Sequence, residues 1–278
     1  MQPPGRRAPR LLKHDAARQL TERYDEHAAH YRELWAPLLH AAGLGILREL
    51  AGAPPAPVRR VLEVGAGVGA LLPELQRAFP GASVLGLDRS HGMLGQAPRR
   101  TRRVVADARA VPVAAGCVDL VLCVFVLFHL DEPLQGLREA RRVLRAGGRV
   151  GTVTWGSELE SRATRLWTAC LDEHGAQEPD PATAARDAAV DTPEKLETLL
   201  RAAGFASARA WRGDLADTIG LEHLVRLKTR MGKEKSRFDS LAQDAREACV
   251  ASARRRMGEL GPADFVARGK VVYAVGNG

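Results

Sequence analysis

The chain has no closely spaced pair of cysteines. Its 278 residues include four cysteines, Cys117, Cys123, Cys170 and Cys249, and no two of them form a C-x-x-C pair. Neither a zinc site nor a disulfide framework is therefore predicted, and the sequence fits a reducing cytoplasm. Cys117 and Cys123 fall in one predicted strand, where we expect small, buried, apolar side chains.

Long apolar runs are also missing. No stretch approaches the roughly 18 apolar residues that a membrane-spanning helix needs. The N-terminus "MQPPGRRAPR" is basic, but the apolar core of a secretory signal does not follow it. We expect residues 1–10 to be a disordered tail.

Aromatic residues make up only 5% of the chain, whereas its formal net charge is +8. A basic protein can bind nucleic acid. However, the arginine clusters at 99–103 and 253–256 have few aromatic residues between them on which bases could stack. The excess arginine is spread through an Ala/Arg/Gly-rich chain, which argues against a nucleic-acid partner.

Strands alternate with helices over the middle of the chain. Residues 11–50 have the spacing of amphipathic helices, and the linker "AGAPPAP" (51–57) follows them. Strands are then expected at 58–64, 83–88, 102–107, 118–126 and 149–155, with helices at 68–79, 91–97 and 134–145; the last helix should stop at "AGG". Such continuous Val/Leu runs predict a doubly wound α/β fold with a mainly parallel sheet.

The last third of the chain has a different pattern. Helices are expected at 161–177 and 192–202, a strand at 204–211, a charged helical stretch at 219–260 and a final strand at 269–276. This order predicts a hairpin at the sheet edge, with the helical insertion as a lid. We therefore divide the chain into an N-terminal helical lid (11–57), a cofactor-binding core (58–160) and a C-terminal part (161–278).

Three glycines follow the first predicted strand: Gly65, Gly67 and Gly69. Ligands bind such sheets at the carboxyl ends of the strands. Gly65 and Gly67 would let the backbone approach a ligand, and a helix from Val68 would point its N–H groups at it. Because the motif also fits G-x-G-x-x-A, a dinucleotide is an alternative.

Carboxylates end three successive predicted strands: Glu63, Asp88 and Asp107. Asp88 could accept both hydroxyls of a ribose, and Asp107 could accept an exocyclic amino group of adenine. Three acids suit a neutral or cationic adenosine ligand better than a pyrophosphate. Capping of a helix or turn is the alternative for Glu63 and Asp88.

The motifs "VLEVGAGVG", "LGLDRSHGML", "VVADARAVPV", "CVDLVLCVFVLFHLDEP" and "LREARRVLRAGGRVGTVTW" occur in this order. Together they resemble the class I S-adenosylmethionine-dependent methyltransferases, and most of all the group that acts on small molecules. The resemblance is close over residues 58–155. Ala146 departs from it, because the family usually has proline there. The resemblance implies a seven-stranded, Rossmann-like sheet and S-adenosylmethionine as cofactor, with S-adenosylhomocysteine as product.

The resemblance also implies roles for single residues. Gly65, Ala66 and Gly67 would lie along the methionine moiety, and Glu63 would hold that loop or reach the ammonium group. Asp88 would bind the ribose. The adenine would lie among Arg89, Met93, Asp107 and Ala108, and the backbone of Cys123 and Val124 would close the pocket.

His129 is the candidate general base, since it follows the fourth predicted strand. Its alternative role is to shape the pocket or cap a helix. Tyr31, with Tyr24 and Trp35, could face the sulfonium, or these rings could simply pack. His27 and His30 have a metal-like spacing without a third ligand, so no metal is predicted.

The expected function is methyl transfer to a small, hydrophobic metabolite by a monomer or homodimer. The sequence has no Asn-Pro-Pro-aromatic tetrapeptide and no Pro-Cys dipeptide, which favours a small acceptor. Three alternatives remain open: an RNA or protein methyltransferase, a non-catalytic binder of the cofactor, and a nicotinamide-dependent oxidoreductase.

Overall fold

The computed structural model describes residues 8–52 and 57–278, with side chains from residue 18 onward. Over this part of the chain, seven strands form one sheet in the order β3-β2-β1-β4-β5-β7-β6. The strands are β1 (Arg60–Val64), β2 (Ser83–Asp88), β3 (Arg102–Val105), β4 (Val118–Val124), β5 (Leu144–Trp155), β6 (Ser207–Thr218) and β7 (Val266–Asn277). Strands β1 to β5 pair in parallel, and β7 runs antiparallel between β5 and β6. The predicted fold class is confirmed, including the hairpin at the sheet edge.

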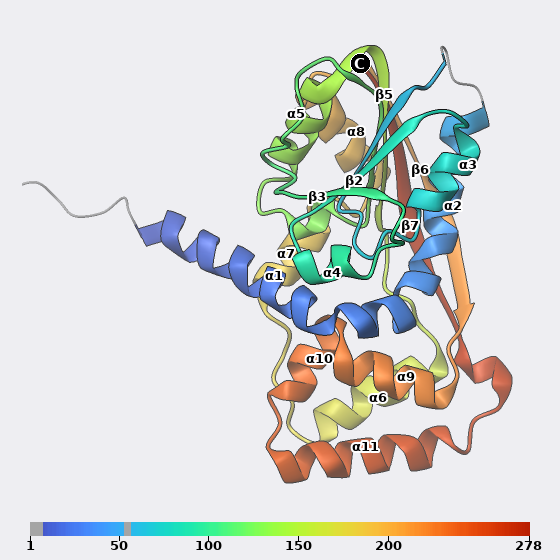
Figure 1. Cartoon of the computed structure of the whole chain (residues 1–278). Coiled ribbons are helices and arrows are strands. Elements are labelled where there is room, and N and C mark those ends of the chain that lie inside the picture. The colour runs from blue at the N-terminus through green and yellow to red at the C-terminus, as the bar shows by residue number, and fades with distance from the viewer. Residues whose placement is uncertain (1–7, 53–56) are drawn as a thin grey trace, which may run out of the picture.

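Helices cover both faces of the sheet (Figure 1). They are α1 (Ala8–Leu34), α2 (Ala36–Gly52), α3 (Leu72–Ala78), α4 (His91–Gly95), α5 (Pro133–Val143), α6 (Arg162–Glu173), α7 (Pro181–Ala188), α8 (Pro193–Ala202), α9 (Leu221–Arg230), α10 (Gly232–Asp239) and α11 (Gln243–Met257). One apolar cluster packs α2 and α3 against the sheet and another packs α5 and α8 against it. Strand β4 lies between the two, and its Leu120, Val121 and Leu122 are fully buried, as a parallel sheet covered on both faces requires.

Helices α6, α9, α10 and α11, called the lid below, share an apolar core. Trp167 of α6, Leu224 of α9 and Cys249 of α11 belong to a third cluster and are almost completely buried. In Figure 1 these helices and α10 lie together below the sheet, and α1 crosses between them and α4. The carboxyl ends of the parallel strands therefore face a space roofed by α1 and the lid.

Several predicted element bounds were wrong. Helix α1 begins at Ala8, so the predicted tail is helical over 8–10; residues 1–7 lie outside the described part of the chain, as do 53–56 of the predicted linker. Helix α5 ends at Val143, before the "AGG" segment, because Leu144 already pairs with Val118 in the sheet. Cys117 lies just before β4 and is half-buried, whereas Cys123 is buried as expected. Helix α7 had not been predicted.

Candidate functional site

The loop after β1 is a turn and not the start of a helix. Helix α3 begins at Leu72, four residues later than predicted. Gly65, Gly67 and Gly69 all have positive φ angles, 70°, 54° and 68°, which favour glycine and cannot continue a right-handed helix. The expectation that a helix from Val68 points its N–H groups at a ligand was therefore wrong.

Protein packing also requires two of these glycines. A Cβ on Gly65 would lie 2.2 Å from Cγ2 of Val126, and one on Gly69 would lie 2.8 Å from Cβ of Ala97. At Gly67 the nearest atom is farther away, Cε of Met93 at 3.2 Å. Gly65 and Gly67 both line the cavity described below. The loop therefore packs tightly against the protein on one side and faces the cavity on the other.

Glu63 is a buried carboxylate with an unused acceptor. Its side chain is 3% exposed, and its Oε2 is buried without a hydrogen-bond partner among the described residues. Burial, and then the charge of Asp88, raises the pKa of Glu63 to about 8. A nearby positive charge would stabilise the ionised form of such a buried acid.

Asp88 fastens the glycine loop to the end of β2. Its Oδ2 accepts a hydrogen bond from the Gly67 amide at 2.8 Å, and its Oδ1 accepts one from the Ser90 amide at 2.9 Å. Burial raises the pKa of Asp88 although these two bonds lower it. A carboxylate has about four acceptor positions, so both oxygens retain capacity toward the cavity.

Asp107 forms an ion pair with Arg109. Nε of Arg109 donates to Oδ1 at 3.0 Å and Nη2 donates to Oδ2 at 2.7 Å. Burial alone would raise the pKa of Asp107, but the bonds from Arg109 outweigh it and hold the pKa below its ordinary value. An adenine amino group would have to share this carboxylate with Arg109.

These groups open into one cavity of about 610 Å³. At one end lie the glycine loop, Asp88 and Asp107. At the other end lie apolar side chains, among them Trp35, Trp155, Ile219, Leu224, Leu227 and Met231. The cavity is thus polar and acidic beside the strand ends, whereas the lid end combines apolar side chains with both basic and acidic ones, such as Lys233, Asp187 and Glu234.

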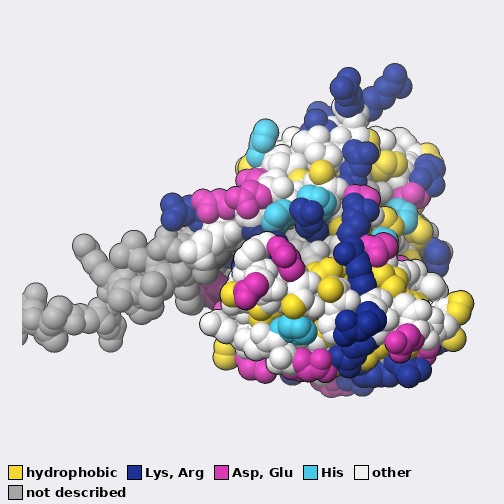
Figure 2. Space-filling view, turned by 90° about the horizontal axis from the view of Figure 1, so that it is seen from below, with side chains coloured by type: hydrophobic (Ala, Val, Ile, Leu, Met, Phe, Trp, Pro, Cys, Tyr) yellow, Lys and Arg dark blue, Asp and Glu magenta, His cyan; other side chains and the backbone are white. Residues whose placement is uncertain are grey.

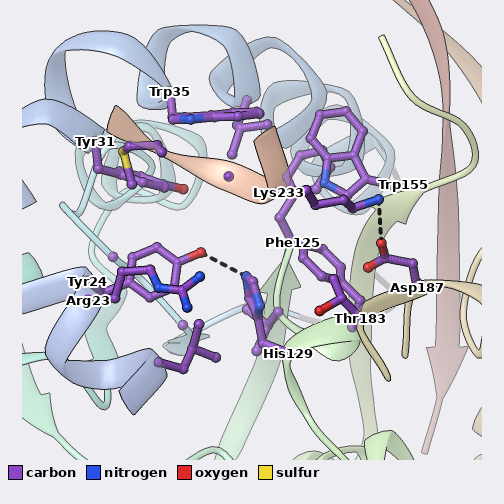
Figure 3. Close-up of a pocket in the computed structure, with 18 of the residues that line it drawn as sticks. Arg23, Tyr24, Tyr31, Trp35, Phe125, His129, Trp155, Thr183, Asp187 and Lys233 are labelled. Atoms are coloured by element: carbon purple, nitrogen blue, oxygen red, sulfur yellow. Dashed lines mark hydrogen bonds and ion pairs between the residues drawn. The ribbon is translucent and has the colours of Figure 1, made fainter. Parts of the chain in front are cut away.

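Helix α1 is fastened over the strand ends by two contacts. Oδ1 of Asp25 accepts hydrogen bonds from the Ser90 hydroxyl at 2.6 Å and from the Gly92 amide at 2.7 Å. At the preceding residue, the Tyr24 hydroxyl lies 3.0 Å from Nε2 of His129, and Figure 3 shows this pair beside the cavity. The roof over the cofactor end therefore depends on polar side chains of α1.

His129 is a weak proton acceptor in this setting. Burial, followed by the charges of Arg89, Arg186 and Arg23, lowers its pKa to about 3. The imidazole is therefore neutral at pH 7, and its Nε2 is already engaged with Tyr24. Its role as a general base stays a prediction, and these surroundings favour the alternative that it shapes the pocket.

Aromatic rings surround the middle of the cavity. The rings of Tyr24 and Tyr31 of α1 meet edge to face with their centroids 5.9 Å apart, and the ring centroids of Phe125 and Trp155 are 4.6 Å apart. Figure 3 places Trp35 above this group and Phe125 near its centre. Phe125 has a φ of 56°, a strained backbone of the kind that collects at functional sites.

The structure brings most of the predicted residues together. Those that line the cavity are Tyr31, Gly65, Gly67, Asp88, Arg89, Met93, Asp107, Ala108, Val124 and His129. Glu63, Ala66 and Cys123 are buried behind this wall, where the Ala66 amide donates to the carbonyl oxygen of Leu87 at 2.8 Å.

Sequence reasoning missed much of the lid end. Trp155 ends a strand and could have been found by the rule that ligands bind at the carboxyl ends of strands. Thr183, Arg186 and Asp187 come from the unpredicted helix α7, and Lys233 comes from α10. No motif marks these residues, because they reach the cavity only through the packing of the lid.

Of the remaining candidate features, His27 lines the cavity. Among the described residues no cluster of three or more His, Cys, Asp or Glu could hold a metal ion, and the His27 and His30 ring centroids are 6.0 Å apart. No residue of the two arginine clusters lines the cavity. On the lid, Arg254 pairs with Glu222 and Arg256 with Glu173. Figure 2 shows a row of Lys and Arg on this face with Asp and Glu on either side.

Comparison with known proteins identifies the family. Residues 62–151 match the family model described as a methyltransferase domain. A malonyl-[acyl-carrier protein] O-methyltransferase of Methylococcus capsulatus is 34% identical over 194 residues, which are 67% of this chain and 62% of that protein. The chain belongs to the class I S-adenosylmethionine-dependent methyltransferases. An uncharacterized methyltransferase of Mycobacterium tuberculosis is 35% identical over 53% of this chain and 57% of its own length.

Solved methyltransferases share the fold. Phosphoethanolamine N-methyltransferase 2 of Haemonchus contortus, solved with phosphomonomethylethanolamine and S-adenosylhomocysteine, has a TM-score of 0.53 at 18% identity. That comparison covers 91% of this chain and 57% of the other. The chain spans about a third to three-fifths of the length of the first curated relatives it matches. No helix in the described part of the chain is both long and apolar enough to cross a membrane.

Proposed function

We propose that this protein transfers a methyl group from S-adenosylmethionine to a small, largely hydrophobic metabolite. One observation carries the proposal: a single cavity of about 610 Å³ joins the carboxylates at the strand ends to an apolar chamber under the lid. A volume of this size suits a cofactor and a small acceptor together.

The residues at the strand ends fit this cofactor. S-adenosylmethionine, when bound, supplies a methyl carbon activated by positive sulfur. The unpartnered Oε2 of Glu63 suits the ammonium group, directly or through water, because a positive charge would stabilise the ionised form of this buried acid. Asp88 retains acceptor positions for ribose hydroxyls, and Arg89, Met93, Asp107 and Ala108 would surround the adenine.

The neighbouring rings would serve the transfer in two ways. Tyr31 and Tyr24 roof the space next to Gly67 and would exclude water from it. Their electron-rich faces would favour a positive sulfur there. Methyl transfer mainly requires that an acceptor be aligned at about 3 Å, and the apolar chamber formed by Trp35, Phe125 and Trp155 would position its body.

Calorimetry tests the site. We expect S-adenosylmethionine and S-adenosylhomocysteine to bind the purified protein and NAD not to bind. Asp88→Ala and Asp107→Ala should each weaken binding by roughly 1–3 kcal/mol, through the lost hydrogen bonds. Glu178→Ala is the matched control, because Glu178 does not line the cavity. Unchanged affinity in both Asp variants, or binding of NAD alone, would refute the assignment.

A further inference from the structure

Three arginines line the cavity near His129. Arg23 of α1 and Arg186 of α7 both line the cavity, as does Arg89. Arg23 precedes Tyr24, whose hydroxyl lies 3.0 Å from Nε2 of His129, and Arg186 belongs to α7, which packs against the turn Leu127–His129. Helices α1 and α7 lie far apart in the sequence, so the fold itself assembles this group of cations.

Arg23 has no counter-ion among the residues whose side chains the structure describes. Over the part of the chain that the structure describes with side chains, no carboxylate lies within ion-pair distance of its guanidinium, and it donates no hydrogen bond there. In Figure 3 this guanidinium lies beside the Tyr24 ring and points toward His129. The side chain therefore presents a full positive charge to the cavity.

Arg186 is only loosely satisfied. Its Nη1 lies 3.8 Å from Oδ1 of Asp131, longer than a hydrogen bond, and its Nη2 donates to the Thr183 hydroxyl at 3.1 Å. A guanidinium has five N–H donors, so most of them remain for a ligand. By contrast, Lys233 is held by two carboxylates, Glu158 at 2.5 Å and Asp187 at 2.7 Å.

We propose that the acceptor carries a carboxylate on an apolar body, and that Arg23 and Arg186 bind this carboxylate beside His129. The inference rests on the proposed methyl transfer. Guanidinium groups recognise carboxylates with charge-assisted, often bidentate hydrogen bonds. The rings of Phe125, Trp155 and Trp35 line the adjoining chamber, where the apolar body would lie.

A carboxylate acceptor also fits the lack of a strong base at this wall. One carboxylate oxygen would give its electron pair to the methyl carbon, and the carbon–sulfur bond would break with its electrons remaining on sulfur. No proton is taken up or released, so the neutral His129 is not asked to act as a base. The products are an uncharged methyl ester and an uncharged thioether, and the ester no longer attracts the two arginines.

Two probes of one chain length test the proposal directly: decanoic acid and decanamide, titrated into the full-length protein saturated with S-adenosylhomocysteine. We expect decanoate to bind about tenfold more tightly than decanamide. Arg23→Gln and Arg186→Gln should remove most of this preference, chiefly by weakening the binding of decanoate. Arg23→Lys and Arg186→Lys keep the positive charge, so they should retain part of the preference for decanoate. Arg100→Gln changes a residue outside the cavity and should retain the whole preference.

The outcomes separate this proposal from the proposed function. If S-adenosylhomocysteine does not bind, the proposed function fails. If it binds but decanoate is not preferred, or neither probe binds, the carboxylate proposal is overturned. It is also overturned if Arg23→Gln weakens S-adenosylhomocysteine itself, because Arg23 would then hold the amino-acid carboxylate of the cofactor. When the product methylated from tritium-labelled S-adenosylmethionine is treated with alkali, the label should be released as methanol, as a methyl ester requires. Label that stays on the product in alkali would contradict the carboxylate proposal.

Discussion

The glycine loop after β1 is held by hydrogen bonds from its own amides, whereas the lid over the cavity is held by packing of its side chains. The amides of Ala66 and Gly67 are hydrogen-bonded to the end of β2, and no Cβ fits at Gly65. The lid meets α1 through buried Leu34, which belongs to the lid's apolar cluster, and through the exposed ion pair of Arg226 with Glu33 at 2.6 Å. Exposed pairs contribute little free energy, so apolar packing is the main contact between the lid and α1.

The lid nevertheless has a substantial core, and the largest effect is expected there. Trp167 is completely buried among apolar residues of α6, α9 and α11. Trp167→Ala should lower the free energy of unfolding by roughly 3–5 kcal/mol. Urea denaturation followed by circular dichroism measures this, with Trp167→Phe as the smaller change. A loss below about 1 kcal/mol would mean that the lid cluster is not well packed.

Adding a single methyl group to the glycine loop should lower the free energy of unfolding. Gly65→Ala adds a Cβ that would lie 2.2 Å from Val126, at a φ of 70°. We expect a loss of roughly 2–4 kcal/mol in unfolding free energy. Gly116→Ala is a matched control with a φ of 67° and no atom within 4 Å of its Cβ, so it should cost only about 1 kcal/mol. Equal losses in the two variants would show that packing against Val126 is unimportant.

The buried acid behind the loop should make stability depend on pH. Because the pKa of Glu63 rises from 4.5 to about 8 on folding, the folded state favours the protonated form. Its stabilising effect is complete below the unfolded pKa and is lost as the pH rises through about 8. Glu63→Gln stays neutral, so its stability relative to the ligand-free wild type should increase by on the order of 2 kcal/mol between about pH 5 and about pH 9.

Denaturation series at matched pH values check this. The same series on Glu178→Gln, outside the cavity, should parallel the wild type. Parallel curves for Glu63→Gln and the wild type would mean that Glu63 is not an isolated buried acid.

The smallest effect is expected where α1 meets the sheet. Tyr24→Phe removes the hydrogen bond to His129 and should cost about 0.5–1.5 kcal/mol of unfolding free energy. The low pKa of His129 should persist, because burial is its main cause, and NMR titration of the imidazole measures it. A return of that pKa to its ordinary value would show that Tyr24 keeps water away from the ring.

The same contrast explains what could be predicted from the sequence. The strands and the acids at their ends follow from local patterns: apolar runs, glycines after β1, and Asp88 and Asp107 where strands end. The start of α3 was misplaced because positive φ angles at Gly67 and Gly69 delay the helix. Arg186 and Lys233 could not be found, since short lid helices bring them to the cavity through long-range packing.

A crystal structure of the protein grown with S-adenosylhomocysteine tests the central claim most directly. The account predicts the adenosine beside Asp88 and Asp107, the ammonium group near Glu63, and the sulfur facing the chamber between Tyr31 and Trp155. A ligand bound elsewhere, or a diphosphate compound lying over Gly65 and Gly67, would contradict it.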